Sequence, residues 1–169
     1  MRLIHMVMLE LLKKGTPDNQ PVIDINAVIA LLCDETRIID WDDADDALNL
    51  LDPSYREDLS TLIATALDQE FSTEARLFAI EAATKIDPDL REVVKFLVKL
   101  LKDKENLVRH TVAIALRDCA SEDYSLVVPA LAEAAKDWHS YLGTQITAFS
   151  TLVVLLGSRR AVESLLSLK

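Results

Sequence analysis

The sequence predicts an all-α protein, a solenoid of about five stacked antiparallel helix hairpins. Three observations predict it. A unit of 33 to 35 residues recurs along the chain, each clear copy contains two apolar runs with helical spacing, and the composition favours helices. With three glycines there is little material for tight β-turns, and the low share of aromatic residues, 5%, is typical of closely packed helices. Because helix hairpins of one length stack side by side, the repeat predicts a solenoid.

The clearest repeat consists of two segments that each begin with Asp-Pro, then a polar residue, an apolar residue and Arg-Glu. The segment DPSYREDLSTLIATALD from Asp52 aligns without a gap on DPDLREVVKFLVKLLKD from Asp87, at an offset of 35 residues. A third, weaker copy, VVPALAEAAKD, starts at Val127. Between these segments, EARLFAIEAATKI and LVRHTVAIALRDC repeat at an offset of 33 residues. The alternation of two run types defines a two-helix unit.

We expect ten helices in five pairs. Their approximate ranges are 2–14, 22–33, 41–51, 54–68, 73–86, 89–102, 106–119, 124–136, 141–156 and 159–168. Pro53 and Pro88 fit the first turn of a helix, where a missing N–H is tolerated. Pro129 falls inside an apolar run, so this helix should begin near Val127 or bend at the proline.

The whole chain, residues 1–169, is predicted to form one domain. It comprises an atypical N-terminal helix pair at 1–36, repeats at 37–156 and a C-terminal capping helix at 157–169. The capping helix should pack on the preceding pair. Apolar residues that recur at matching repeat positions should be buried between hairpins: Leu62, Ile63, Leu97, Leu100, Leu101, Val112, Leu116 and Leu131.

The run NLVRHTVAIALRDCA resembles the first helix of a HEAT repeat, with Val108 and Arg109 followed by Ala115 and Leu116. The resemblance covers roughly residues 41–156, and the tetratricopeptide pattern is absent. It implies a right-handed, armadillo-like α-solenoid. It also implies that Arg76 and its repeat equivalent Arg109 pair with acidic groups between neighbouring units, a role that glycine in the last copy cannot fill.

In HEAT arrays the second helices of the units line a concave face, so the resemblance implies that their polar residues contact a partner. This face should run from acidic to basic along the solenoid. The expected contact residues are Glu57, Asp58, Thr61, Thr65, Arg91, Glu92, Lys95, Lys99, Lys102, Glu133 and Lys136.

The net charge of −10 resides in residues 1–70, where five Lys and Arg face fifteen Asp and Glu; residues 71–169 are balanced. The densest acidic cluster is Asp42, Asp43, Asp45 and Asp46. Helix capping and the helix dipole account for part of this cluster. The remainder could form a docking patch for a basic partner. Direct nucleic-acid binding is disfavoured, because phosphate neutralisation supplies most of that affinity.

No nucleophile, phosphate-loop or metal-ligand motif occurs, so we expect neither an enzyme nor a cofactor or metal. Cys33 and Cys119 should be reduced packing residues. The N-terminal run lacks a cleavage site and no apolar stretch is long enough to span a membrane, which favours a cytoplasmic protein.

The sequence therefore predicts a protein-interaction module that binds a partly basic partner. Such a module would be a scaffold, an adaptor, an assembly factor or an inhibitor, and the inhibitors include those of the immunity type. The alternative is a HEAT-like enzyme subunit of the bilin lyase type or a chaperone. A HEAT-like DNA glycosylase would need a basic channel that this sequence lacks.

Overall fold

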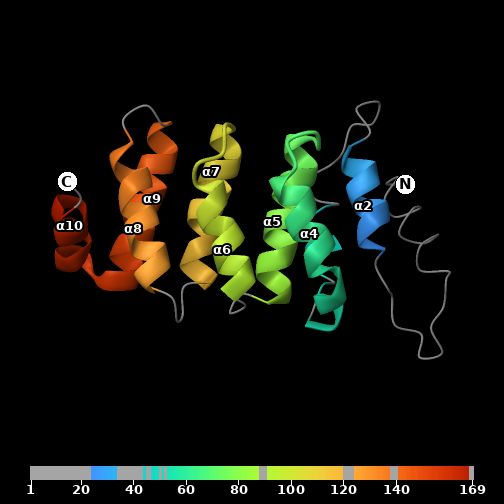
Figure 1. Cartoon of the computed structure of the whole chain (residues 1–169), viewed down its shortest axis with the longest axis horizontal. Coiled ribbons are helices and arrows are strands. Elements are labelled where there is room, and N and C mark those ends of the chain that lie inside the picture. Colours follow the sequence, from blue (N-terminus) through green and yellow to red (C-terminus); the bar gives the residue numbers. More distant parts are fainter. Residues whose placement is uncertain are drawn as a thin grey trace.

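The computed structural model describes residues 24–33, 44, 47–49, 51, 53–87, 91–119, 124–137 and 141–167, and within these ranges all regular structure is helical. The helices are α2 (Ile25–Leu32), the 3₁₀ helix η1 (Pro53–Asp58), α4 (Leu59–Leu67), α5 (Thr73–Ile86), α6 (Arg91–Leu100), α7 (Asn106–Cys119), α8 (Tyr124–Lys136), α9 (Leu142–Leu156) and α10 (Ser158–Ser167). They lie side by side along one axis (Figure 1). Within the described ranges no helix is long and apolar enough to cross a membrane.

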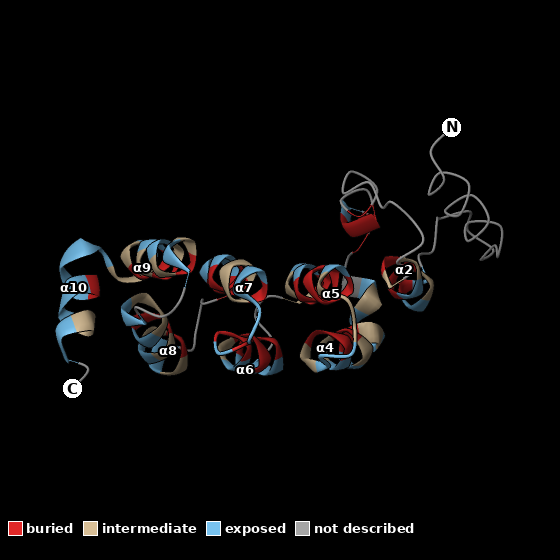
Figure 2. Cartoon of the chain, turned by 90° about the horizontal axis from the view of Figure 1, so that it is seen from above, coloured by how far each residue is buried: buried red, intermediate tan, exposed pale blue. Residues whose placement is uncertain are grey.

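The helices form two rows, as a solenoid requires (Figure 2). One row contains α5, α7 and α9, and the other contains α4, α6 and α8. Packing is most extensive for α4 with α5, α8 with α9 and α7 with α9. All three of these contacts cross the unit boundaries expected from the sequence. The contact of α7 with α9 joins equivalent helices of neighbouring units, and the other two arise because a period sets the length of a unit but not the helix at which the unit begins. The predicted all-α solenoid is confirmed.

The core lies between the two rows, and it contains nearly all of the apolar residues predicted from the repeat. Leu62, Leu97, Leu100, Leu101, Val112, Leu116 and Leu131 are buried. Ile63 differs, since it is half-buried at the edge of this core. Of the two free cysteines, Cys119 is buried and Cys33 is half-buried.

One helix start differs from the sequence-based expectation, and a second one decides between alternatives that the sequence left open. The predicted helix at 54–68 begins as the 3₁₀ helix η1, a tighter geometry that is common at helix N-termini. Helix α8 begins at Tyr124, not at Val127, and Pro129 lies inside it. The proline has no N–H for the carbonyl four residues earlier, so one helical hydrogen bond is missing there.

Helix α2 is held against the start of α5. Helix α2 lies beside α5 at the end of the first row (Figure 2). The Ser72 hydroxyl caps α5 by accepting a hydrogen bond from the Ala75 N–H, and it donates to the Leu32 carbonyl at 2.9 Å. The side chain that starts α5 therefore also holds the end of α2.

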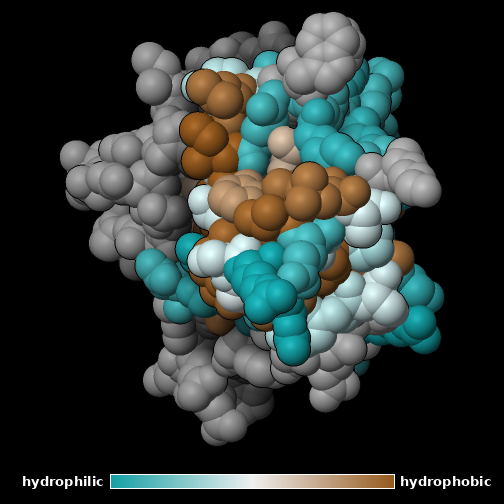
Figure 3. Space-filling view, turned by 90° about the vertical axis from the view of Figure 1, so that its left-hand side faces the viewer, coloured by the Kyte–Doolittle hydropathy of each residue, from teal (hydrophilic) through white to brown (hydrophobic). Residues whose placement is uncertain are grey.

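The C-terminal helix α10 packs against α8 and α9, as predicted. Ala161 is fully buried there, and the Lys136 ammonium donates to the Leu165 carbonyl at 3.1 Å. The outer face of α10 exposes Val162 and Leu166. Figure 3 shows this end of the molecule, where hydrophobic side chains form a patch between hydrophilic ones.

Deletion of residues 159–169 is expected to expose the apolar surface that α10 covers on α8 and α9. The truncated protein should aggregate and should melt at a lower temperature, as measured by light scattering and calorimetry. Leu166→Ser is the matched control, because Leu166 is 78% exposed and its replacement should leave both measurements unchanged. A truncated protein that stays monomeric with an unaltered melting temperature would contradict the packing role of α10.

Candidate functional site

The exposed surface of α4, α6 and α8, here called the second-helix face, carries most of the polar residues predicted to contact a partner. Exposed residues are Glu57, Arg91, Glu92, Lys95, Lys99, Lys102, Glu133 and Lys136, and half-buried residues are Asp58 and Thr61. Thr65 was predicted wrongly as a contact residue, because it is 3% exposed and belongs to the core. The other side chains give this face an acidic end at η1 and a basic centre at α6.

Helix α6 and the turn after it present four cations on one side. Arg91, Lys95, Lys99 and Lys102 are spaced four, four and three residues apart, which places them on one face of a helix. The opposite side of α6 buries five apolar residues, among them Phe96 and Leu97. Because that apolar stripe sits in the core, the row of cations must face solvent. We call these four residues the basic ridge.

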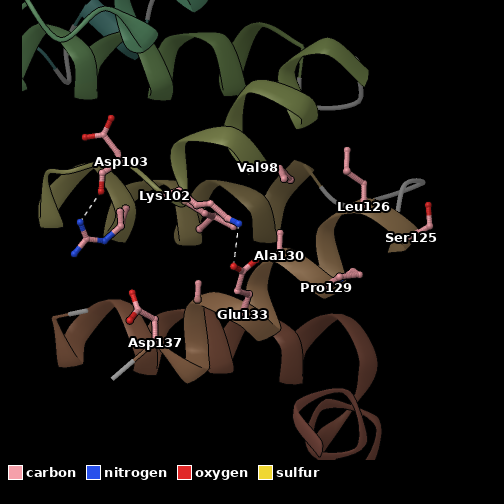
Figure 4. Close-up of a pocket in the computed structure, with 12 residues that line it drawn as sticks. Val98, Lys102, Asp103, Ser125, Leu126, Pro129, Ala130, Glu133 and Asp137 are labelled. Atoms are coloured by element: carbon pink, nitrogen blue, oxygen red, sulfur yellow. Dashed lines mark hydrogen bonds and ion pairs between the residues drawn. The ribbon is translucent and has the colours of Figure 1, made fainter. Parts of the chain in front are cut away.

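A groove of about 690 Å³ lies beside the basic ridge, between α6 and α8 (Figure 4). Its apolar lining comes from both helices and from the turn after α6: Val98, Leu101, Leu126, Pro129, Ala130 and Ala134. Lys102 and Glu133 form an ion pair of 2.9 Å between the two helices. Both partners are more than half exposed, so this pair contributes little to stability and leaves the groove accessible.

The far end of the groove is lined by Asp103, Arg109 and Asp137. Arg109 donates hydrogen bonds to the backbone carbonyls of Asp103, at 2.6 Å, and of Lys104, at 3.0 Å. It also contacts the side chain of Asn106. These bonds hold the turn between α6 and α7.

Arg76 makes the predicted ion pair. Its guanidinium donates to both carboxylate oxygens of Asp103, and its Nε donates to the Ala66 carbonyl at 3.0 Å. Arg76 thus links the last turn of α4 to the turn that follows α6. Burial by itself would raise the pKa of Asp103, but hydrogen bonds from Arg76 and from the Glu105 N–H, with the charges of Arg76 and Lys104, lower it. The carboxylate of Asp103, which lines this end of the groove, is therefore buried and ionised.

The acidic end of the second-helix face brings together carboxylates from α2 and η1. Burial raises the pKa of Asp58, and the neighbouring charges of Asp24 and Glu57 raise it further. Asp24 is also the N-cap of α2, where it accepts from the Ala27 N–H at 3.2 Å. The predicted docking residues Asp42, Asp43, Asp45 and Asp46 lie outside the described residues.

Sequence reasoning missed the groove residues Leu126, Pro129 and Ala130. Their signal in the sequence is a proline beside small side chains in an otherwise regular helix, which by itself predicts no groove. Among the described residues no cluster of His, Cys, Asp and Glu could hold a metal ion. His110 is half-buried, and its Nδ1 lies 3.2 Å from the Thr147 hydroxyl.

Two rows of helices with an accessible second-helix face define an α-solenoid of the kind that binds other molecules along its surface. The family model of HEAT repeats matches residues 59–148, and the chain belongs to this family. HEAT repeats generally mediate protein–protein interactions. No curated protein matches the chain, and no solved structure does.

Proposed function

We propose that this chain is a non-enzymatic protein-binding module that contacts its partner through the second-helix face. The observation that carries the proposal is the basic ridge beside an open groove of about 690 Å³. Exposed cations next to accessible apolar side chains are the two components of a specific protein interface. Polar groups that line the groove already interact with each other, since Lys102 and Glu133 form an ion pair.

The charge gradient along this face supports a partner with two complementary regions. A partly basic region would meet the acidic end, formed by Glu57 and Asp58. The predicted docking residues Asp42, Asp43, Asp45 and Asp46 belong to the same acidic half of the sequence. An acidic region would meet the basic ridge. Such a partner suits an adaptor, an assembly factor or an inhibitor, including an inhibitor of the immunity type. We place this function in the cytoplasm.

The proposal is tested by capturing partners on the tagged protein, identifying them by mass spectrometry and then measuring binding with the purified partner. The variant Lys95→Glu with Lys99→Glu reverses the basic ridge and should weaken binding. The variant Asp45→Asn with Asp46→Asn should slow association, and wild-type binding should weaken as salt rises. Both variants should fold normally, because Lys95 and Lys99 are exposed and aspartates beyond a helix cap contribute little to stability.

The matched control for the ridge variant is Arg159→Glu with Arg160→Glu, which makes the same change in net charge as Lys95→Glu with Lys99→Glu, on exposed residues of α10. This control should bind as the wild type does. A partner that binds all three variants with unchanged affinity would refute the second-helix face as the contact surface. Absence of any saturable protein partner would refute the binding function itself.

A further inference from the structure

We infer that the groove between α6 and α8 receives a short amphipathic helix of the partner, with acidic residues along the side that faces α6. This inference rests on the proposed function and adds to it the conformation and the charge of the bound segment. Three features of the groove carry it: its length, the size of the side chains that line it, and the distribution of charge along its two edges.

The length of the groove matches a few helical turns. The residues of α8 and the turn after it that line the groove recur about four apart, as Ser125 and Leu126, Pro129 and Ala130, Glu133 and Ala134, and finally Asp137. At a rise of 1.5 Å per residue, the distance from Ser125 to Asp137 is about 18 Å. A helix of about twelve residues covers the same distance, so a bound helix could lie along α8 over the full groove.

The lining allows a helix to approach closely. Ala130 and Ala134 are small, and both are half-buried. Small side chains let helix axes come within about 8–10 Å of each other, which a groove lined by long side chains would prevent. Val98 and Leu126, also half-buried, leave apolar surface that a leucine or phenylalanine of the partner would cover. Apolar residues spaced three and four apart on the bound helix would reach this floor.

The charges select an acidic segment. Lys95 and Lys99 lie on the same face of α6 as Lys102, which lines the groove. Both are exposed, and within the described residues neither forms an ion pair. On the α8 edge, the carboxylate of Glu133 is neutralised by Lys102 at 2.9 Å. A helix with Glu or Asp facing α6 would therefore meet unpaired cations, whereas a basic helix would be repelled by them.

The inference is tested with a phage-displayed library of random 16-residue peptides, selected on the full-length protein. The enriched peptides are then synthesised with a fluorescent label, and their affinity is measured by anisotropy. We expect enriched sequences to be acidic, with Leu, Ile or Phe spaced three and four apart, and to gain helical circular dichroism on binding. Lys95→Glu with Lys99→Glu should weaken their binding by about tenfold or more, since two favourable ion pairs become repulsive.

A second variant tests the groove floor without changing the ridge. Ala130→Arg places a long side chain in the groove and should abolish peptide binding, while circular dichroism reports whether this variant still folds. The control Arg159→Glu with Arg160→Glu should retain wild-type affinity. Enriched peptides that are basic, that stay extended when bound, or that bind the ridge and groove variants as tightly as the wild type would overturn the inference.

The remaining outcomes separate this inference from the proposed function. If the captured partner binds the second-helix face but does not compete with an acidic peptide, the inference fails and the protein-binding function stands. If sedimentation shows a dimer of this chain that the ridge variant dissociates, the groove's occupant is a second copy and the inference is overturned. If neither a peptide nor a protein partner binds saturably, the proposed function fails as well.

Discussion

Arg76→Ala is expected to lower the free energy of unfolding by about 3–5 kcal/mol, because it leaves the buried carboxylate of Asp103 without its cation. The side chains of Arg76 and Asp103 are 2% and 4% exposed, so water cannot replace the lost guanidinium. The substitution also removes the hydrogen bond from Nε to the Ala66 carbonyl, which joins α4 to α5. Urea denaturation followed by circular dichroism measures the effect.

The control is Arg56→Ala, which removes the ion pair of Arg56 with Asp87. The Arg56 side chain is 64% exposed, so this change should cost less than about 1 kcal/mol. If the two variants lower the free energy of unfolding by the same small amount, the ion pair of Arg76 with Asp103 stabilises the protein no more than a surface ion pair does.

The pH dependence gives an independent test of the same pair. Since the folded pKa of Asp103 lies below its unfolded value, its contribution to stability is fully present above about pH 4 and is lost as pH falls through the folded pKa. In Arg76→Ala, burial without the guanidinium would instead raise the pKa of Asp103. Protonation of Asp103 in acid would then remove the cost of burying an unpaired charge. The difference in unfolding free energy between wild type and variant should therefore be largest near neutral pH. It should begin to shrink as pH falls through the raised pKa of the variant, above about pH 4, and should shrink further as pH falls through the lowered pKa of the wild type. A difference that stays constant down to pH 2 would contradict the role of Asp103.

The repeat in the sequence predicted the helices and the core well, because stacking imposes the same burial on equivalent positions. The same reasoning shows where the contact prediction was wrong. Thr65 aligns with Leu100 at an offset of 35 residues, and both are buried. Its polarity suggested a surface residue, but its repeat position is a core position. Ile63 aligns with Val98, and both are half-buried, so this repeat position lies at the edge of the core in these two units.

The partners of the two repeat arginines could not be predicted in the same way. Arg76 and Arg109 occupy equivalent positions, yet Arg76 holds the Asp103 side chain and Arg109 holds the backbone of the same residue. The partner of a flexible side chain depends on distances of a few ångströms, whereas the burial of a helix position recurs with the period of the repeat. The groove is equally local, since it depends on how far α6 and α8 stand apart where Pro129, Ala130 and Ala134 line the gap. Such a distance leaves no periodic signal in the sequence.

Leu97→Ala is expected to cost about 2–5 kcal/mol, through lost burial and through the cavity that remains. Leu97 is fully buried in α6, near the middle of the array, where α6 packs on α4, α7 and α8. Because each unit of a solenoid contacts only its neighbours, a cavity here also weakens the coupling between the two ends. The denaturation curve should shift to lower urea, and its slope should decrease if the two ends begin to unfold separately.

The matched comparison for Leu97→Ala is Ile63→Ala, which removes a similar apolar volume from a half-buried position at the edge of the core. Its cost should be clearly smaller, because part of that side chain already contacts water and the space it leaves opens to solvent. If Leu97→Ala costs under about 1 kcal/mol, or no more than Ile63→Ala, the packing between neighbouring units is looser than their shared burial implies. A large difference between the two would show that the packing of α6 on its neighbours, on the side of α6 opposite the basic ridge, contributes strongly to the stability of the array.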